Sequence, residues 1–93
     1  MNNYIEFLVM LRKKYDLFSI EKAACEAGVT SQTVRNFEKG VSKNSKLIMF
    51  YVRALYQELH YNTDYQANRT GISKRRIKAD VDELIDGFLG KEI

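Results

Sequence analysis

The stretch Ile20–Lys39, IEKAACEAGVTSQTVRNFEK, carries the signals that decide the fold of this chain. Ser19 precedes it and Thr30 lies within it, and both are residue types that cap the first turn of a helix. Gly28 closes the first half, where a glycine can adopt the positive φ that ends a helix. The pattern predicts two helices joined by a tight turn, over residues 20–27 and 31–39.

The side chains along this stretch also suit two helices that cross steeply. Ala24 is small enough for the helices to approach at the crossing point, and Gly28 tolerates the backbone geometry of the turn. Val29, Val34 and Phe37 can bury the second helix against the first. The second helix is therefore expected to expose its remaining, polar side.

These positions resemble the helix-turn-helix of the lambda-repressor-like (Cro/repressor type) family. The similarity extends through Thr33–Gly40, which looks like the recognition helix of that family and its closing glycine. With a helix before it and a helix over Leu47–Leu59, the resemblance covers about residues 4–60. It implies that the second helix enters the DNA major groove. The residues then expected to contact DNA are Ser31, Gln32, Thr33, Arg35, Asn36, Lys39 and Lys43.

The chemistry of these side chains suits bases and phosphates. Gln32 and Asn36 can each bond the edge of adenine through two hydrogen bonds, and Arg35 can do the same with guanine. Lys39 and Lys43 are better suited to phosphate, because an ammonium group is a point charge without a fixed fork of donors.

Two positions depart from the family pattern or leave it open. The family often has glutamine at the first position of the motif, where this chain has Ile20. In the family, a basic residue late in the first helix pairs with a glutamate at the position of Glu38. In this chain that basic residue is Arg12 or Lys13, depending on a shift of one residue in the alignment.

A second copy of the pattern begins at Thr63, in TDYQANRTGISKRRIKADVD. Its residues Ala67, Gly71, Ile72 and Ile77 lie 43 positions after their counterparts in the first copy. The segment 77–84 resembles the recognition helix of winged helix-turn-helix regulators, whose β-hairpin would follow it. Residues 85–93 are too few for a convincing hairpin of that kind.

Charge is distributed unevenly over this second copy. Residues 69–78 include five bases and no acid, whereas residues 80–86 include four acids and no base. Bases at the start of a recognition helix suit phosphate contact, although a solvated helix with pairs such as Lys78 to Asp82 gives the same pattern. The candidate contacts are Lys74, Arg75, Arg76 and Lys78.

The remaining chain also has the character of helices. Apolar residues make up 45% of the 93 residues and there is no proline. Helices are expected over residues 4–15 and 46–61, and the run Leu47–Val52 is apolar on every side. We therefore predict an all-α fold, a compact bundle of five to six helices containing one or two helix-turn-helix units. The predicted domains are a helix-turn-helix DNA-binding domain over residues 1–61 and a second helix-turn-helix-like unit over residues 62–93 that packs on the first. The alternative is a single domain over residues 1–93.

The composition offers little support for other classes of protein. Cys25 and His60 are the only cysteine and histidine, so no disulfide can form within the chain and no zinc site is expected. Cys25 is interpreted as a small packing residue. No catalytic motif is present, and neither an enzyme nor a cofactor is expected. The absence of a signal peptide or an apolar span predicts a cytoplasmic protein.

The sequence thus predicts a sequence-specific double-stranded DNA-binding regulator of transcription, of the phage or mobile-element type. A net charge of +3 permits an anionic partner without requiring one. The alternative is a protein-binding adaptor or anti-regulator that keeps the fold without binding DNA. A homodimer through the apolar helix around Leu47–Leu59 is a further expectation.

Overall fold

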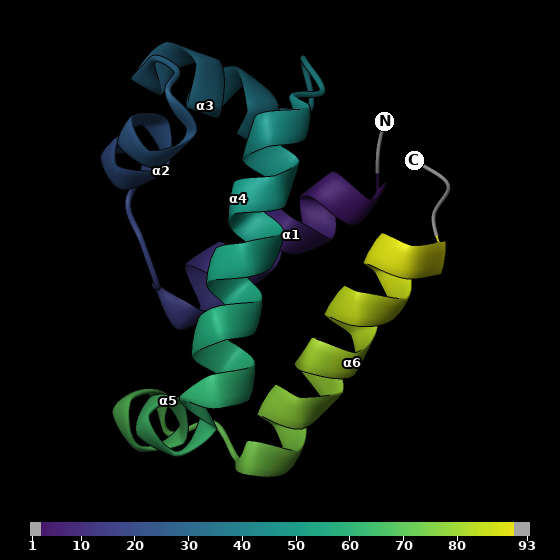
Figure 1. Cartoon of the computed structure of the whole chain (residues 1–93). Coiled ribbons are helices and arrows are strands. Elements are labelled where there is room, and N and C mark those ends of the chain that lie inside the picture. The colour runs from purple at the N-terminus through teal and green to yellow at the C-terminus, as the bar shows by residue number, and fades with distance from the viewer. Residues whose placement is uncertain (1–2, 91–93) are drawn as a thin grey trace. The chain divides into compact units, whose positions relative to one another are not determined.

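The computed structural model describes residues 3–90, and all regular structure in this range is helical (Figure 1). The predicted all-α class is therefore confirmed. The chain divides into two compact units, Met1–Tyr51 and Val52–Ile93. The division falls inside a helix, earlier than the boundary after residue 61 that the end of the predicted helix suggested. The helices are α1 (Asn3–Tyr15), α2 (Ile20–Ala27), α3 (Ser31–Glu38), α4 (Ser45–Tyr56), the π-helix η1 (Gln57–Tyr61), α5 (Thr63–Thr70) and α6 (Lys74–Gly90).

In unit 1, the predicted caps define the ends of α2 and α3. The Ser19 and Thr30 hydroxyl oxygens each accept a hydrogen bond from a backbone N–H in the first turn of their helix, at 3.0 and 3.1 Å. Gly28 ends α2 with φ +72°, and its N–H donates to the carbonyls of Ala24 and Cys25. The short turn that results lets α3 pack on α2 (Figure 1).

The core of unit 1 is rich in aromatic rings. The Tyr51 ring lies 5.0 Å from that of Phe18 and 5.2 Å from that of Phe37, measured between centroids. Such tilted and edge-on ring pairs add to the free energy gained by burying their area. The side chains buried around them include Leu8, Leu11, Tyr15, Ala24, Val34 and Leu47.

Helix α4 is confirmed as a helix, but it is not buried on every side. Leu47, Ile48 and Tyr51 are buried, whereas Met49 is 42% exposed. A helix turns about 100° per residue, so a run that is apolar all round still leaves one side away from the core. The apolar run Leu47–Val52 therefore leaves Met49 exposed on the surface of the single chain.

After Tyr56 the helical run continues as η1 (Figure 1), a change of hydrogen-bond pattern that the sequence did not predict. The Thr63 hydroxyl donates to the carbonyls of Leu59 and His60 at 2.6 and 3.0 Å. A hydroxyl that bonds backbone carbonyls in this way competes with the regular helix ladder. Helix α5 begins directly afterwards at Thr63, and the Asn62 side chain makes no capping bond to it.

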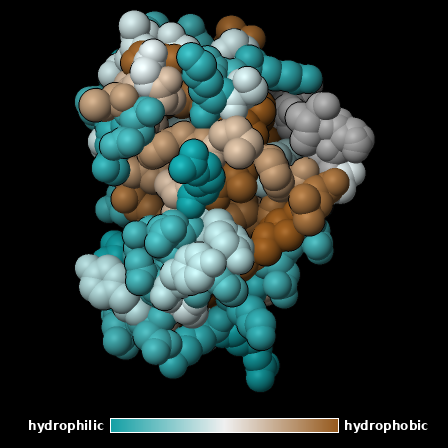
Figure 2. Space-filling model, viewed as in Figure 1, coloured by the Kyte–Doolittle hydropathy of each residue, from teal (hydrophilic) through white to brown (hydrophobic). Residues whose placement is uncertain are grey.

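In unit 2, α5 and α6 share with α2 and α3 a glycine that ends the first helix and a hydroxyl that caps the second. Gly71 ends α5 with φ +77°, and its N–H donates to the Ala67 carbonyl. The Ser73 hydroxyl caps α6 by accepting from the Arg76 N–H at 3.2 Å. Ile77 is fully buried, as Val34 is in the first copy. On the face drawn in Figure 2, hydrophilic side chains predominate around α5.

Gln66 is the buried polar side chain of unit 2, and both its amide nitrogen and its amide oxygen are hydrogen-bonded. Its nitrogen donates to the Glu58 carboxylate at 2.9 Å, and its oxygen accepts from two guanidinium nitrogens of Arg69. Buried amides that keep their hydrogen bonds avoid the desolvation penalty of an unpaired polar group. Helix α6 continues to Gly90, so residues 85–90 form no hairpin, and 91–93 lie outside the described range. In residues 3–90, no helix is both long and apolar enough to cross a membrane.

Candidate nucleic-acid interface

Helix α3 has one apolar side and one polar side. Val34 and Phe37 are fully buried, whereas Gln32, Arg35 and Lys39 are exposed. Because residues three and four apart share a helix face, the buried pair fixes which side faces outward. The remaining predicted contacts of this helix, Ser31, Thr33 and Asn36, are half-buried.

The end of α3 is held by a hydrogen-bonded ion pair to α1. Arg12 Nε lies 2.6 Å from Glu38 Oε2, and Arg12 Nη2 lies 2.8 Å from Oε1, so the guanidinium engages both carboxylate oxygens. Arg12 also donates from Nη1 to the Phe18 carbonyl at 3.3 Å. The partner of Glu38 that the sequence left open is therefore Arg12 rather than Lys13.

Tyr51 is a third member of this network, and its role was not expected from the sequence. Its hydroxyl donates to Glu38 Oε2, which links α4 to the same carboxylate. The Arg12 and Glu38 side chains are only 12% and 9% exposed. The hydrogen bond to Glu38 raises the pKa of Arg12, and burial followed by the bond to Glu38 raises the pKa of Tyr51. The network thus joins three helices through one shielded carboxylate.

The buried tyrosines predict a loss of stability at high pH. Burial raises the pKa of Tyr4 to about 12, and the pKa of Tyr51 is raised as well, from an ordinary value of 10.0. The folded chain therefore holds these protons more tightly than the unfolded chain does. The free energy of unfolding should be undiminished below about pH 10 and should fall as the pH rises from there to about 12.

Denaturant unfolding across this pH range checks the expectation. Tyr51→Phe removes one of the two groups, so its stability should fall less steeply above about pH 10 than that of the native chain. Tyr61→Phe is the matched control, because the Tyr61 ring is 66% exposed. A native chain whose stability stays constant up to about pH 12 would contradict the assignment.

Two pairs of polar groups order the exposed side of α3. The Thr33 hydroxyl lies 2.9 Å from that of Thr30, so it belongs to the helix cap. Gln32 Nε2 donates to Asn36 Oδ1 at 3.1 Å, one helical turn further on. The hydroxyl is therefore engaged within the chain, while the two amides keep part of their hydrogen-bonding capacity.

Each helix pair also has an acidic residue near the start of its first helix that pairs with a base on its second. Arg35 Nη2 lies 3.8 Å from Glu21, and Lys74 Nζ lies 2.9 Å from Asp64. Glu21 and Asp64 are separated by the same 43 positions as the two copies of the motif. All four side chains are at least 45% exposed. Exposed pairs of this kind contribute roughly 0–1 kcal/mol, so either base can exchange its partner for another anion.

The predicted basic residues fall into two groups, one in each unit. Lys43 is exposed in the loop before α4 of unit 1. In unit 2, the predicted bases share the start of α6, and Asp82 and Asp86 lie exposed further along it. The exposed bases of α6 are Lys74, Arg75, Arg76 and Lys78.

The net charge of the chain belongs to unit 1. Residues 1–51 include eight lysines and arginines against five acids, whereas residues 52–93 include seven of each. A unit with excess positive charge attracts polyanions at a distance, and a neutral unit does so only through a local cluster. Unit 1 is thus the better candidate for the main anion-binding surface.

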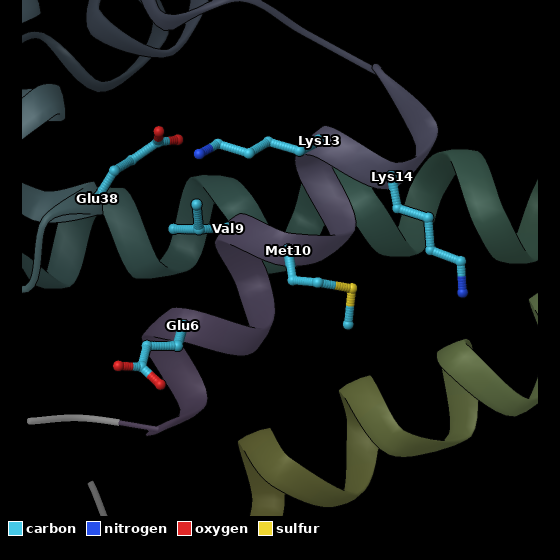
Figure 3. A pocket seen from close by; sticks show the side chains of 6 residues that line it. All are labelled: Glu6, Val9, Met10, Lys13, Lys14 and Glu38. Carbon is cyan, nitrogen blue, oxygen red and sulfur yellow. The ribbon is translucent and has the colours of Figure 1, made fainter.

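A hollow of about 570 Å³ lies along α1 in unit 1 (Figure 3). Five of its lining residues come from α1 and one, Glu38, from the end of α3 (Figure 3). None of the predicted DNA contacts lines it, so it has no place in that interface. The lining residues are Glu6, Val9, Met10, Lys13, Lys14 and Glu38.

One expected packing role is wrong. Cys25 is exposed on α2 and fills no space in the core. The small residues that pack in the core are Ala23 and Ala24. Because successive residues are rotated by about 100° around a helix, Cys25 is turned away from the side that these two alanines bury. In the described part of the chain, no three His, Cys, Asp or Glu side chains gather closely enough to hold a metal ion.

Comparisons of the chain with protein-family models, with curated proteins and with solved structures returned no match. The resemblance to lambda-repressor-like proteins therefore stays a prediction.

Proposed function

We propose that the chain is a sequence-specific double-stranded DNA-binding regulator of transcription, whose helix α3 enters the major groove. One observation carries the proposal. The side of α3 opposite the fully buried Val34 and Phe37 exposes Gln32, Arg35 and Lys39, an amide, a guanidinium and an ammonium group. These groups can form hydrogen bonds to base edges and contacts to phosphates.

The anchoring of α3 supports the proposal. A recognition element gains affinity when it is held in its bound geometry before the ligand arrives. The paired Arg12 and Glu38, with the Tyr51 hydroxyl, fasten the end of α3 to two other helices. The exposed side chains therefore project from a rigid support.

Positive charge supplies the second part of the proposal. Lys39 and Lys43 would contact phosphates beside α3. The bases of α6, at 74–78, would add sequence-independent contacts through unit 2. Two contact regions on one chain would let a monomer gain avidity, because the second region binds at a high effective concentration once the first is bound.

The apolar helix gives less support to the expected homodimer. Leu47, Ile48, Leu55 and Leu59 are buried within the chain, so their side chains are already covered. Met49 is the large apolar residue of α4 that is exposed. The homodimer remains a prediction, to be tested by measuring mass in solution.

Binding to a randomised duplex pool tests the proposal directly. The association constant is measured by fluorescence anisotropy over a series of salt concentrations. A plot of its logarithm against the logarithm of the salt concentration should have a slope of about −3 or steeper, because each neutralised phosphate contributes about −0.9 to the slope. No binding at low salt would overturn the proposal and would favour the protein-binding adaptor.

Arg35→Ala should weaken binding to the selected duplex by about tenfold or more, because the guanidinium can engage a guanine edge through two hydrogen bonds. Losing the exposed contact to Glu21 should leave stability nearly unchanged. Arg53→Ala, which removes an exposed arginine of α4, is the matched control and should bind as the native chain does. Equal affinities of the two variants would count against α3 as the reading helix.

A further inference from the structure

Gln32 and Asn36 form a connected pair of amides on the exposed side of α3. Gln32 Nε2 donates to Asn36 Oδ1 at 3.1 Å, and the residues lie one helical turn apart. The backbone carbonyl of Asn36 accepts from the Val41 N–H at 2.9 Å, which holds this part of the helix end in place. Within residues 3–90, neither side-chain amide bonds any other protein group.

The bond within the pair leaves a defined pattern of free groups. It uses a donor of Gln32 and an acceptor of Asn36, so the Gln32 oxygen and the Asn36 nitrogen remain available. If both side-chain amides are rotated by 180°, Asn36 donates to Gln32 instead. The Gln32 nitrogen and the Asn36 oxygen then remain available. In either arrangement the pair therefore offers an unused amide oxygen, which accepts, beside an unused amide nitrogen, which donates.

Adenine is the base whose major-groove edge complements this pattern. Its N7 accepts a hydrogen bond and its N6 amino group donates one, whereas guanine has two acceptors at the same edge. We infer that Gln32 and Asn36 act as one unit that selects adenine at a single position of the DNA target. This inference rests on the proposed DNA-binding function and adds that the two amides read one adenine jointly instead of one adenine each.

The mutual bond explains why the two residues should act together. Each amide restricts the rotamers of the other before DNA binds, so less side-chain freedom is lost on binding. Removing either amide leaves the other without its orienting partner. The neighbours do not replace them, because the Thr33 hydroxyl is engaged by Thr30 and the Arg35 guanidinium has donors only.

Selection from a randomised duplex pool, followed by affinity measurements on the selected duplex, tests this inference. The native chain should select adenine at one position and bind the duplex with guanine there about tenfold more weakly. Gln32→Ala and Asn36→Ala should each lose this preference, and the double variant should lose nothing further. Gln57→Ala removes an exposed glutamine from η1, and it should retain the preference as a matched control.

A base analogue supplies a second readout that does not depend on altering the protein. Replacing the selected adenine by 7-deazaadenine removes the N7 acceptor, so it should weaken the native chain and leave the double variant unaffected. Salt-dependent binding with the adenine preference intact in both single variants would overturn the inference while leaving the proposed function standing. Absence of salt-dependent binding to any duplex would overturn both.

Discussion

Glu38→Ala should lower the free energy of unfolding by about 3–5 kcal/mol, because it leaves the Arg12 guanidinium shielded from water without its counter-charge. The Arg12 and Glu38 side chains are 12% and 9% exposed, and their contact uses two hydrogen bonds. The Tyr51 hydroxyl would lose its acceptor at the same time. Denaturant unfolding followed by far-ultraviolet circular dichroism measures the effect.

Glu26→Ala is the matched control for this experiment. It removes an exposed pair in which Lys22 Nζ lies 3.7 Å from Glu26, one turn apart on α2, and it should cost about 0.5 kcal/mol or less. Replacing Arg12 and Glu38 together by methionine should restore much of the stability, since no shielded charge is then left unpaired. A Glu38→Ala variant within about 1 kcal/mol of the native chain would refute the role of the network.

Phe37→Ala should be comparably destabilising, by about 3–5 kcal/mol, because it opens a cavity in the core of unit 1. The Phe37 ring is fully buried and lies 5.2 Å from the Tyr51 ring. The lost stability has two parts: the transfer free energy of the deleted ring atoms, and the cost of a cavity that the surrounding side chains fill only in part. The measurement is the unfolding free energy, with duplex affinity measured where the variant is fully folded.

Phe37→Leu provides a graded form of the same test, because it fills part of the cavity and should cost less than the alanine variant. Val41→Ala is the control on a nearby residue: Val41 is 70% exposed, and its replacement should change stability by about 0.5 kcal/mol or less. If Phe37→Ala and Val41→Ala were equally stable, Phe37 would not lie in the core of unit 1.

The ends of the helices were predictable from short segments of sequence. Ser19, Thr30 and Ser73 cap their helices through bonds to a backbone N–H three residues later. Gly28 and Gly71 end theirs with positive φ. These features depend on neighbours within one helical turn, so the sequence contains all the information that determines them.

The candidate site was predictable only in part. The exposed positions of Gln32 and Arg35 follow from the helical period once Val34 and Phe37 are assigned to the core. The exposure of Cys25 and the π-helix after Tyr56 did not follow. The exposure of Cys25 depends on which side of α2 the rest of unit 1 covers, and no residue pattern in the sequence marks the change to a π-helix.

By itself, the sequence determined which segments are helical, the caps at Ser19, Thr30 and Ser73, and the polar side of α3, because these arise from contacts between residues close along the chain. Only the tertiary structure decided that Arg12, and not Lys13, engages Glu38, and that Tyr51 joins them. Arg12 and Glu38 are 26 positions apart, so their meeting depends on how α1 is rotated within the core. A shift of one residue rotates a side chain by about 100° around its helix, which is enough to move a charge from the buried network into solvent.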